Sequence, residues 1–130
     1  PALRLRAAVS MVKELAAGDA VSYGCTFRAP KPMRAATLAV GYADGYPRAL
    51  SGRGTVSLHG RPARVLGRVC MDQLLVDATD TGAAVGDVAT LIGADGPERI
   101  TAEEAAEAAG TIANELLCRI GPRVPRVYLR

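Results

Sequence analysis

The segment Gly41-Tyr42-Ala43-Asp44-Gly45-Tyr46-Pro47-Arg48 places two tyrosines, an aspartate and an arginine among residues that favour tight turns. Glycine adopts turn conformations that other residues resist, and proline presets one backbone dihedral angle. Arginine binds carboxylates and other small anions through paired N–H groups. The segment therefore has two candidate roles, which the sequence leaves open: a recognition loop, or a structural turn in which Asp44 caps backbone amides.

A second candidate residue is Tyr23, in the segment Val21-Ser22-Tyr23-Gly24. A phenol ionises near pKa ~10, so a tyrosine acts as a general base at neutral pH only if a nearby cation favours the phenolate. The sequence does not identify that cation. A buried tyrosine with a single hydrogen-bond partner is the alternative.

The third candidate segment is Gly67-Arg68-Val69-Cys70-Met71-Asp72-Gln73. A charged aspartate beside apolar strand residues must be hydrogen-bonded or exposed. Met71-Asp72 therefore predicts a bulge or turn that Asp72 holds. Cys70 has the character of a small buried apolar residue.

Metal and disulfide chemistry find little support in the sequence. The three cysteines, Cys25, Cys70 and Cys118, are odd in number and far apart, which argues against a disulfide framework and fits a reducing cytoplasm. His59 is the only histidine, whereas a zinc site needs about four grouped ligands. We therefore predict a cytoplasmic protein with no metal.

The net charge of +3 arises from 16 lysine and arginine residues against 13 acidic ones. The cations are scattered, and four tyrosines and one phenylalanine make a poor platform for stacking nucleic-acid bases. We therefore predict no nucleic-acid partner. No apolar run approaches the roughly 18 residues of a membrane span, so we also predict no membrane association.

Strand signals dominate the elements that would position these residues. Leu3, Leu5, Ala7 and Val9 alternate with other residues, which is typical of a half-buried strand, here extending to Leu15. Residues 41–54 form a long irregular connection, and such loops in compact domains are commonly functional. Further strands are predicted over residues 20–23, 35–40, 55–58, 63–66, 68–76, 88–92 and 124–129, with a hairpin turn at 59–62. The pattern predicts a mainly β barrel or sandwich.

Two helices are predicted near the end of the chain. Thr101 and Glu104 form a capping-box pattern before a helix that ends at Gly110. Thr111 is predicted to cap a second helix that runs through Ile120. A length of 130 residues predicts one domain, residues 1–130. The chain opens on Pro1 rather than Met, which suggests a segment of a longer protein.

Taken in order, the three candidate segments resemble the C-terminal domain of alanine racemases, which are fold-type III enzymes dependent on pyridoxal 5'-phosphate. The likeness continues to Arg123-Val124-Pro125-Arg126-Val127-Tyr128. It implies a mainly β, partly open, Greek-key-like β-barrel with two short helices near the C-terminus. It further implies that an N-terminal (β/α)8 barrel, absent from this sequence, holds pyridoxal phosphate on a lysine. The resemblance also implies a head-to-tail dimer, in which each C-terminal domain completes the active site of the partner subunit.

The resemblance assigns roles to individual residues. Tyr23 matches the catalytic tyrosine that transfers the substrate's α-proton on one face, while the cofactor lysine acts on the other. Met71 matches the residue whose backbone amide holds the substrate carboxylate, and Asp72 belongs to the same turn. Tyr42 matches a tyrosine that lines the site. The implied function is interconversion of L- and D-alanine by two-base proton transfer, with a small amino acid as substrate.

Further along the site, Arg48, Arg68 and Ile112 match residues of the substrate access corridor. Asn114 departs from the family, which usually carries a tyrosine there, next to the cofactor phosphate. Racemases associated with vancomycin resistance that act on serine are similar in having asparagine. We therefore hypothesise that the parent enzyme accepts serine as well as alanine; tolerated variation among ordinary alanine racemases is the alternative.

The small number of lysines limits the cofactor chemistry that this chain can perform alone. Lys13 and Lys31 are the only lysines, and neither matches the cofactor lysine. We therefore predict that the chain binds no pyridoxal phosphate covalently and does not racemise by itself. Its predicted partner is the N-terminal cofactor-binding barrel of the partner subunit. The alternative function is a stand-alone β-barrel binding module that has lost catalysis.

Overall fold

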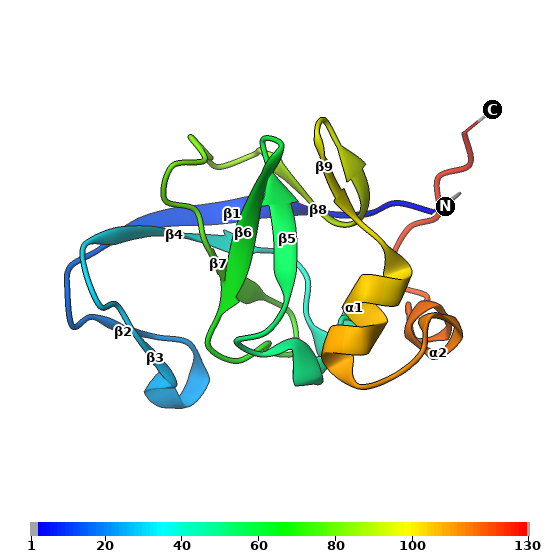
Figure 1. The fold of residues 1–130 in the computed structure, drawn as a ribbon, viewed down its shortest axis with the longest axis horizontal. Helices are drawn as coiled ribbons and strands as arrows, with labels where there is room; N and C mark the ends of the chain where they lie inside the picture. Colours follow the sequence, from blue (N-terminus) through cyan, green and yellow to red (C-terminus); the bar gives the residue numbers. More distant parts are fainter. Residues whose placement is uncertain (1–2, 130) are drawn as a thin grey trace.

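The computed structural model describes residues 3–129, with the side chain of Tyr23 outside the described part. Strands make up most of the regular secondary structure, and two short helices follow them (Figure 1). The strands are β1 Leu5–Leu15, β2 Ala20–Val21, β3 Phe27–Arg28, β4 Met33–Leu38, β5 Thr55–Leu58, β6 Arg61–Leu66, β7 Leu74–Asp77, β8 Val88–Asp95 and β9 Glu98–Ile100. The helices are α1 Ala102–Ala109 and α2 Ala113–Cys118, with the 3-10 turns η1 Tyr23–Cys25, η2 Tyr42–Asp44 and η3 Arg48–Leu50.

The large sheet is antiparallel and its hydrogen-bonded pairings form a ring. Strand order is β1-β4-β7-β6-β5-β8-β9, and β1 also pairs with β8. The N-terminal part of β1 pairs with β8, from Leu5 opposite Ile92, and its C-terminal part pairs with β4, ending at Leu15 opposite Met33. One long strand therefore closes the ring, and the mainly β fold with two short C-terminal helices is confirmed.

The predicted alternation of buried and exposed residues in the first strand holds only for its N-terminal half. Leu5, Ala7 and Val9 are buried, and a register shift follows between Val9 and Met11. A bulge of this kind moves the following side chains to the opposite face. Met11 is accordingly exposed, and Leu15 is buried in a second, smaller core.

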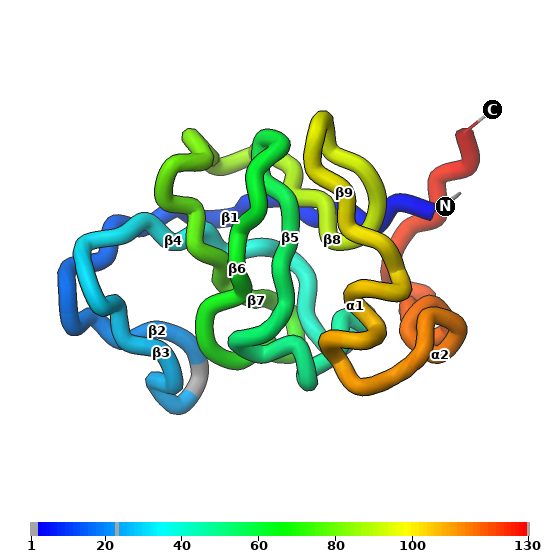
Figure 2. Tube along the Cα trace, viewed as in Figure 1, coloured from blue at the N-terminus to red at the C-terminus, as the bar shows by residue number. Residues whose placement is uncertain are grey.

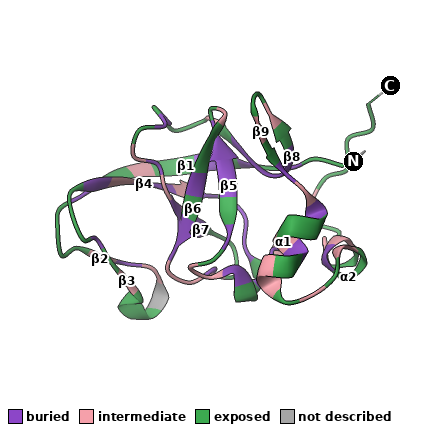
Figure 3. Ribbon diagram, viewed as in Figure 1, coloured by how far each residue is buried: buried purple, intermediate pink, exposed green. Residues whose placement is uncertain are grey.

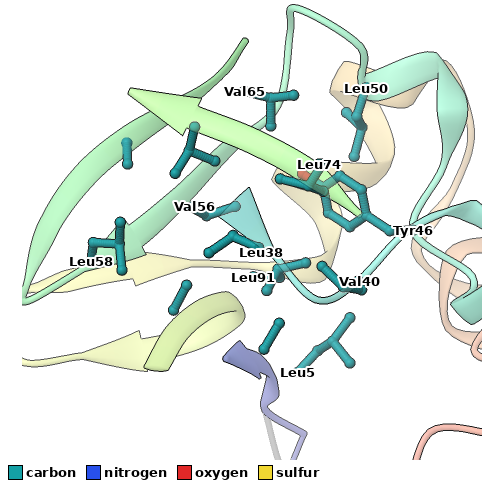
Figure 4. Packing of buried hydrophobic residues seen from close by; sticks show 14 of the residues in the cluster. Leu5, Leu38, Val40, Tyr46, Leu50, Val56, Leu58, Val65, Leu74 and Leu91 are labelled. Carbon is teal, nitrogen blue, oxygen red and sulfur yellow. The ribbon is translucent and has the colours of Figure 1, made fainter. Parts of the chain in front are cut away.

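The main core fills the ring. Figure 3 shows buried residues concentrated on the ring strands, and Figure 4 shows the packing of their side chains. Tyr46 lies in this core with only 4% of its surface exposed, next to aliphatic residues such as Leu74 and Val40. Burial raises the pKa of the Tyr46 phenol. Tyr46 is therefore a packing residue, which leaves Tyr42 as the exposed tyrosine of its loop.

The β2–β3 hairpin projects from the ring at the end opposite to the helices (Figure 2). Its anchor is the second core cluster, in which Val21, Leu15 and Leu66 are all buried. The structure differs here from the predicted strand over residues 20–23, because strand pairing stops at Val21 and the chain enters η1. The hairpin thus carries the Tyr23 segment on a short, separately packed arm.

The capping residues predicted from the sequence are confirmed for α1 but not for α2. Thr101 caps α1 with a complete capping box, and Gly110 ends the helix with φ 78°. In α2 the N-cap is Ile112, not Thr111, whose hydroxyl instead donates to Glu115 Oε1. The strand predicted over residues 124–129 is wrong. No strand pairing of the described structure includes that segment: Val124 is partly buried against the main core and residues 125–129 are exposed. Pro125 also removes one of the N–H groups that a ladder needs.

A buried polar contact under the β5–β6 turn generates a stability prediction. Fully buried Ser57 donates to Asp95 Oδ2 (2.7 Å), and the Gly60 amide donates to the same oxygen (2.9 Å). These bonds lower the pKa of Asp95. Since the folded pKa lies below the ordinary value of 3.8, the stabilisation is complete above that pH. It is lost as pH falls through the folded pKa.

We expect Ser57→Ala to lower the free energy of unfolding by about 1–2 kcal/mol at neutral pH, because a charged acceptor loses a donor. The difference from wild type should shrink as pH drops below the folded pKa of Asp95. Urea denaturation across pH measures both. Ser10→Ala, which removes an exposed hydroxyl bonded to Thr37 O, is the control. A loss that stays constant down to low pH would contradict the role of the carboxylate.

Candidate functional site

Two loops meet at a cavity of about 380 Å³. One carries residues 41–48 and continues into the turn η3, and the other carries residues 67–73. Tyr42 is 44% exposed and Met71 is 54% exposed, so both side chains are available to a ligand. The residues lining the cavity are Tyr42, Arg48, Arg68, Val69, Cys70 and Met71.

The loop between β6 and β7, residues 67–73, forms the floor of this arrangement. The Cys70 amide donates to Gln73 O (3.0 Å), which closes a turn with Met71 and Asp72 at its centre. The turn predicted at Met71-Asp72 is present, but main-chain atoms close it, and the Asp72 carboxylate accepts from Arg123 rather than holding the turn. Among the described residues, no hydrogen bond uses the Met71 amide as its donor. That N–H is available to an acceptor from outside.

The segment of residues 41–48, called here the Tyr42 loop, lies directly on the 67–73 loop. The Tyr42 amide donates to Cys70 O (2.9 Å), and the Ala43 amide donates to Met71 O (3.0 Å). A Cβ on Gly41 would lie 2.3 Å from each of these two carbonyl oxygens. Only glycine permits so close an approach of the two backbones, and the contact sets Tyr42 against Met71.

Arg123 joins the same two loops through its guanidinium. Its Nε donates to Asp44 Oδ1 and its Nη2 donates to Asp72 Oδ1, both at 2.5 Å. Asp44 also accepts from the Gly41 amide (3.0 Å), as expected for a capping aspartate. The Arg123 hydrogen bond, aided by the Gly41 amide, lowers the pKa of Asp44 against the opposing effect of burial. We call this group the Arg123 clamp.

Serine hydroxyls attach the remaining segments to the 67–73 loop. Ser51 donates to Arg48 O (2.6 Å) and accepts from the Val69 amide (2.8 Å), which ties η3 to the loop. Ser22 donates to Arg68 O (3.0 Å) and accepts from the Arg68 amide (2.8 Å). The segments that contain Tyr23, Tyr42 and Arg48 are therefore all fastened to one short stretch of backbone.

The candidate residues separate into those that line the cavity and those that do not. Tyr42, Arg48, Arg68 and Met71 are brought together around it. Asp72 points to Arg123 instead. Ile112, at 66% exposure, and Asn114, in the first turn of α2, lie outside the cavity lining. Tyr23 begins η1, and its side chain is outside the described part of the structure.

Sequence reasoning missed Arg123 and Ser51. Arg123 lies 79 residues from Asp44 and 51 from Asp72, so no local pattern connects them. Ser51 lies at the end of η3 in a stretch with no distinctive spacing. Their roles follow only from the approach of distant segments in the fold.

A larger cavity of about 610 Å³ borders the candidate site, with Phe27 of β3, Lys31 of the following loop and Arg64 of β6 in its lining. It shares only Arg68 with the candidate site and lacks Tyr42 and Met71. We take the smaller cavity as the candidate site because four residues singled out in the sequence, Tyr42, Arg48, Arg68 and Met71, line it. Within residues 3–129, no group of three or more His, Cys, Asp and Glu side chains could hold a metal, and no helix is long and apolar enough to cross a membrane.

The cavity is suited to a small anion. Arg48 and Arg68 both line it, and neither forms an ion pair with any residue that the structure describes. Unpaired guanidinium groups bind carboxylates strongly. The fold and site together define a small β domain that presents a cationic recognition site assembled from loops.

Comparisons with known proteins identify the family. The family described as "Alanine racemase, C-terminal domain" matches residues 2–128. The alanine racemase of Laribacter hongkongensis is 50% identical over 127 residues, which cover 97% of this chain and 34% of that protein. The structure resembles the crystal structure of alanine racemase from D-cycloserine-producing Streptomyces lavendulae with a TM-score of 0.94 and 46% identity. That match covers all of this chain and 34% of the other.

A further structural match is alanine racemase from Bartonella henselae with covalently bound pyridoxal phosphate, with a TM-score of 0.90 and 35% identity, covering 97% of this chain and 34% of that one. This chain belongs to the family of alanine racemase C-terminal domains. It spans about a third of the length of the relatives that it matches.

The Arg123 clamp generates a prediction about local stability. We expect Arg123→Gln to release the Tyr42 loop from the 67–73 loop, because one cation holds both carboxylates. Hydrogen exchange at the Tyr42 and Ala43 amides should accelerate by at least about tenfold, since local opening then costs less free energy. Acid should likewise lower the protection of these two amides, measured relative to the intrinsic exchange rate at each pH. The lowered pKa of Asp44 means that the contact persists above pH 3.8 and is lost as pH falls through the folded value.

Arg126→Gln is the matched control for that experiment. Arg126 donates to the carbonyl oxygens of Ile120, Gly121 and Val124 and to neither loop. It should leave exchange at Tyr42 and Ala43 unchanged. Equal acceleration in both variants would mean that the C-terminal segment as a whole, rather than the clamp, stabilises the site.

Proposed function

We propose that residues 1–130 are one domain of an alanine racemase and supply the residues that bind and deprotonate the substrate on one face. The observation that carries this proposal is the convergence of Tyr42, Arg48, Arg68 and Met71 on a single cavity. These residues come from two segments separated in the sequence. The family to which the chain belongs gives the reaction class.

The proposed substrate is a small amino acid, and its carboxylate is the group that this cavity recognises. The Met71 amide would hold the carboxylate, with Tyr42 beside it. Arg48 and Arg68, as cations in the cavity wall, would attract the anionic end of the substrate along the access corridor. Ile112 and Asn114 have no contact with this cavity, so their proposed roles require the surface of another domain.

Racemisation needs one base on each face of the α-carbon. One base removes the proton and the other returns it with inverted configuration. In this proposal Tyr23 serves one face. A tyrosine must be ionised to accept a proton, and neighbouring cations favour this phenolate form. A lysine from outside this chain serves the other face.

The residues of this chain do not fit a covalently held pyridoxal phosphate. A Schiff-base lysine is activated by desolvation or by a neighbouring cation. Lys13 and Lys31 are both exposed, and neither lies at the candidate cavity. The cofactor would therefore be held by another domain, where it withdraws electrons from the α-carbon. This chain contributes proton transfer and binding of the carboxylate.

The proposed partner is an N-terminal cofactor-binding barrel, contributed by the other subunit of a dimer. Tyr42, Met71 and Ile112 are all exposed apolar or aromatic residues in the described structure. Exposed apolar surface beside polar groups is typical of an interface. That exposure favours a covered domain over a stand-alone binding module. Cys25, Cys70 and Cys118 are free thiols, in keeping with the predicted cytoplasmic location.

Complementation tests the proposal. We expect no exchange of the α-proton of L-alanine in deuterated water with this chain alone. Exchange should appear when the chain is mixed with a separately produced N-terminal domain carrying pyridoxal phosphate. Tyr23→Phe should reduce this exchange by about 100-fold or more, because general-base catalysis typically contributes that much. Mass spectrometry of the recovered alanine measures exchange.

Two other outcomes would change the assignment. Association of the two domains without any exchange would favour a binding module that retains the fold and has lost catalysis. Full exchange with Tyr23→Phe would show that another group serves as the base.

Substrate range is a separate prediction, centred on Asn114. Asparagine is smaller than tyrosine and both donates and accepts hydrogen bonds, so it leaves room for a hydroxymethyl group. We expect the full-length enzyme to racemise serine as well as alanine. Asn114→Tyr should lower kcat/KM for serine by about tenfold relative to alanine, a loss equivalent to about one hydrogen bond. No serine turnover, together with no effect of Asn114→Tyr, would contradict the hypothesis.

A further inference from the structure

The backbone of Ser22 adopts a conformation that is unusual for any residue except glycine. Its φ is 75° and its ψ is 165°. This region of backbone space is almost restricted to glycine, and other residues persist there only when surrounding contacts enforce it. Ser22 directly precedes Tyr23 in the chain. The strain therefore lies at the point where the main chain enters the residue proposed as the catalytic base.

Two hydrogen bonds from the Ser22 hydroxyl enforce this conformation. Oγ accepts from the Arg68 amide at 2.8 Å and donates to the Arg68 carbonyl at 3.0 Å. Both main-chain polar groups of Arg68 are thus satisfied by one side chain. Glycine would relieve the strain at position 22 but would leave both groups without this partner. The residue type is therefore explained by the contact with Arg68.

The packing around Ser22 reinforces the same contact. A Cβ on Gly67 would lie 2.5 Å from Ser22 Cβ and 2.9 Å from its Oγ, so the two segments approach as closely as glycine permits. On the other side of Tyr23, the Arg68 guanidinium faces Gly24: its Nη1 would lie 3.4 Å from a Cβ there. Arg68 therefore bonds to Ser22 through its backbone and has its side chain close to Gly24, on the other side of Tyr23.

We propose that Ser22 is a positioning residue that fixes the main chain entering Tyr23 relative to the 67–73 loop, which carries Arg68 and Met71. This inference rests on the proposed function of Tyr23. Proton transfer is sensitive to small displacements, and a misplacement of about 1 Å can cost 100-fold in rate. Loss of the Ser22 hydroxyl should therefore impair proton transfer on the face served by Tyr23. The opposite face, served by a lysine outside this chain, should be unaffected.

The test measures α-proton exchange separately from L-alanine and D-alanine in deuterated water with the full-length enzyme. Tyr23→Phe first identifies the enantiomer whose exchange depends on Tyr23. Ser22→Ala, which keeps the Cβ and removes the hydroxyl, should slow exchange of that same enantiomer by about 10- to 100-fold. KM and exchange of the other enantiomer should change by less than about threefold. Such one-sided loss is a signature that general destabilisation does not produce.

Ser22→Gly provides a second variant if Ser22→Ala does not fold. It also lacks the hydroxyl but removes the backbone strain, so it should be the more stable of the two and show the same one-sided loss. Thr81→Val is the matched control. The Thr81 hydroxyl likewise donates to a carbonyl, Ala78 O, and accepts from an amide, that of Ala83, away from the site. It should leave the ratio of the two exchange rates unchanged.

Each result is decisive. If Tyr23→Phe is one-sided and the Ser22 variants slow both enantiomers equally or neither, Ser22 is only structural and the proposed role of Tyr23 stands. If Tyr23→Phe itself produces no one-sided loss, then Tyr23 is not the base. The positioning role of Ser22 is overturned with it.

Discussion

The candidate site depends on hydrogen bonds that converge on the main chain of the 67–73 loop. The Tyr42 loop bonds to Cys70 and Met71, Ser51 bonds to Val69, and Ser22 bonds to Arg68. Each of these bonds attaches a different segment to an adjacent position of the same short backbone. The relative positions of the candidate residues are therefore set by hydrogen bonds to the main chain of this loop, made by the amides of the Tyr42 loop and by two short serine side chains.

The ring of strands explains why this loop is available. β6 and β7 pair only at Val65 with Val76 and at Leu66 with Leu75, so their connection leaves the sheet early. Its backbone N–H and C=O groups then need other partners, because buried polar groups without hydrogen bonds are costly. The loops that supply those partners also carry the candidate residues. Gly41 and Gly67 permit the close approach that this requires.

The arginines near the site divide into two kinds. The Arg123 guanidinium is engaged by Asp44 and Asp72 and holds two loops together. Arg48 and Arg68 line the cavity and, within the described structure, have no acidic partner. A guanidinium saturated by two carboxylates offers little to a ligand, whereas an unpaired one attracts anions. The positive charge at the cavity is thus left for an anionic ligand, while Arg123 holds the two surrounding loops together.

The sequence by itself determined the mainly β class, the β5–β6 hairpin, the capped helix α1 and the segments of the site, because each depends on local periodicity, turn chemistry or capping. It also indicated Tyr42, Arg48, Arg68 and Met71, through the family resemblance. Only the tertiary structure decided that Tyr46 packs the core while Tyr42 faces the cavity, that Asp72 belongs to the Arg123 clamp, and that residues 124–129 form no strand. These outcomes depend on which distant backbones meet. Arg123 lies 79 residues from Asp44, and Ser22 lies 46 from Arg68, so their pairing has no local signal.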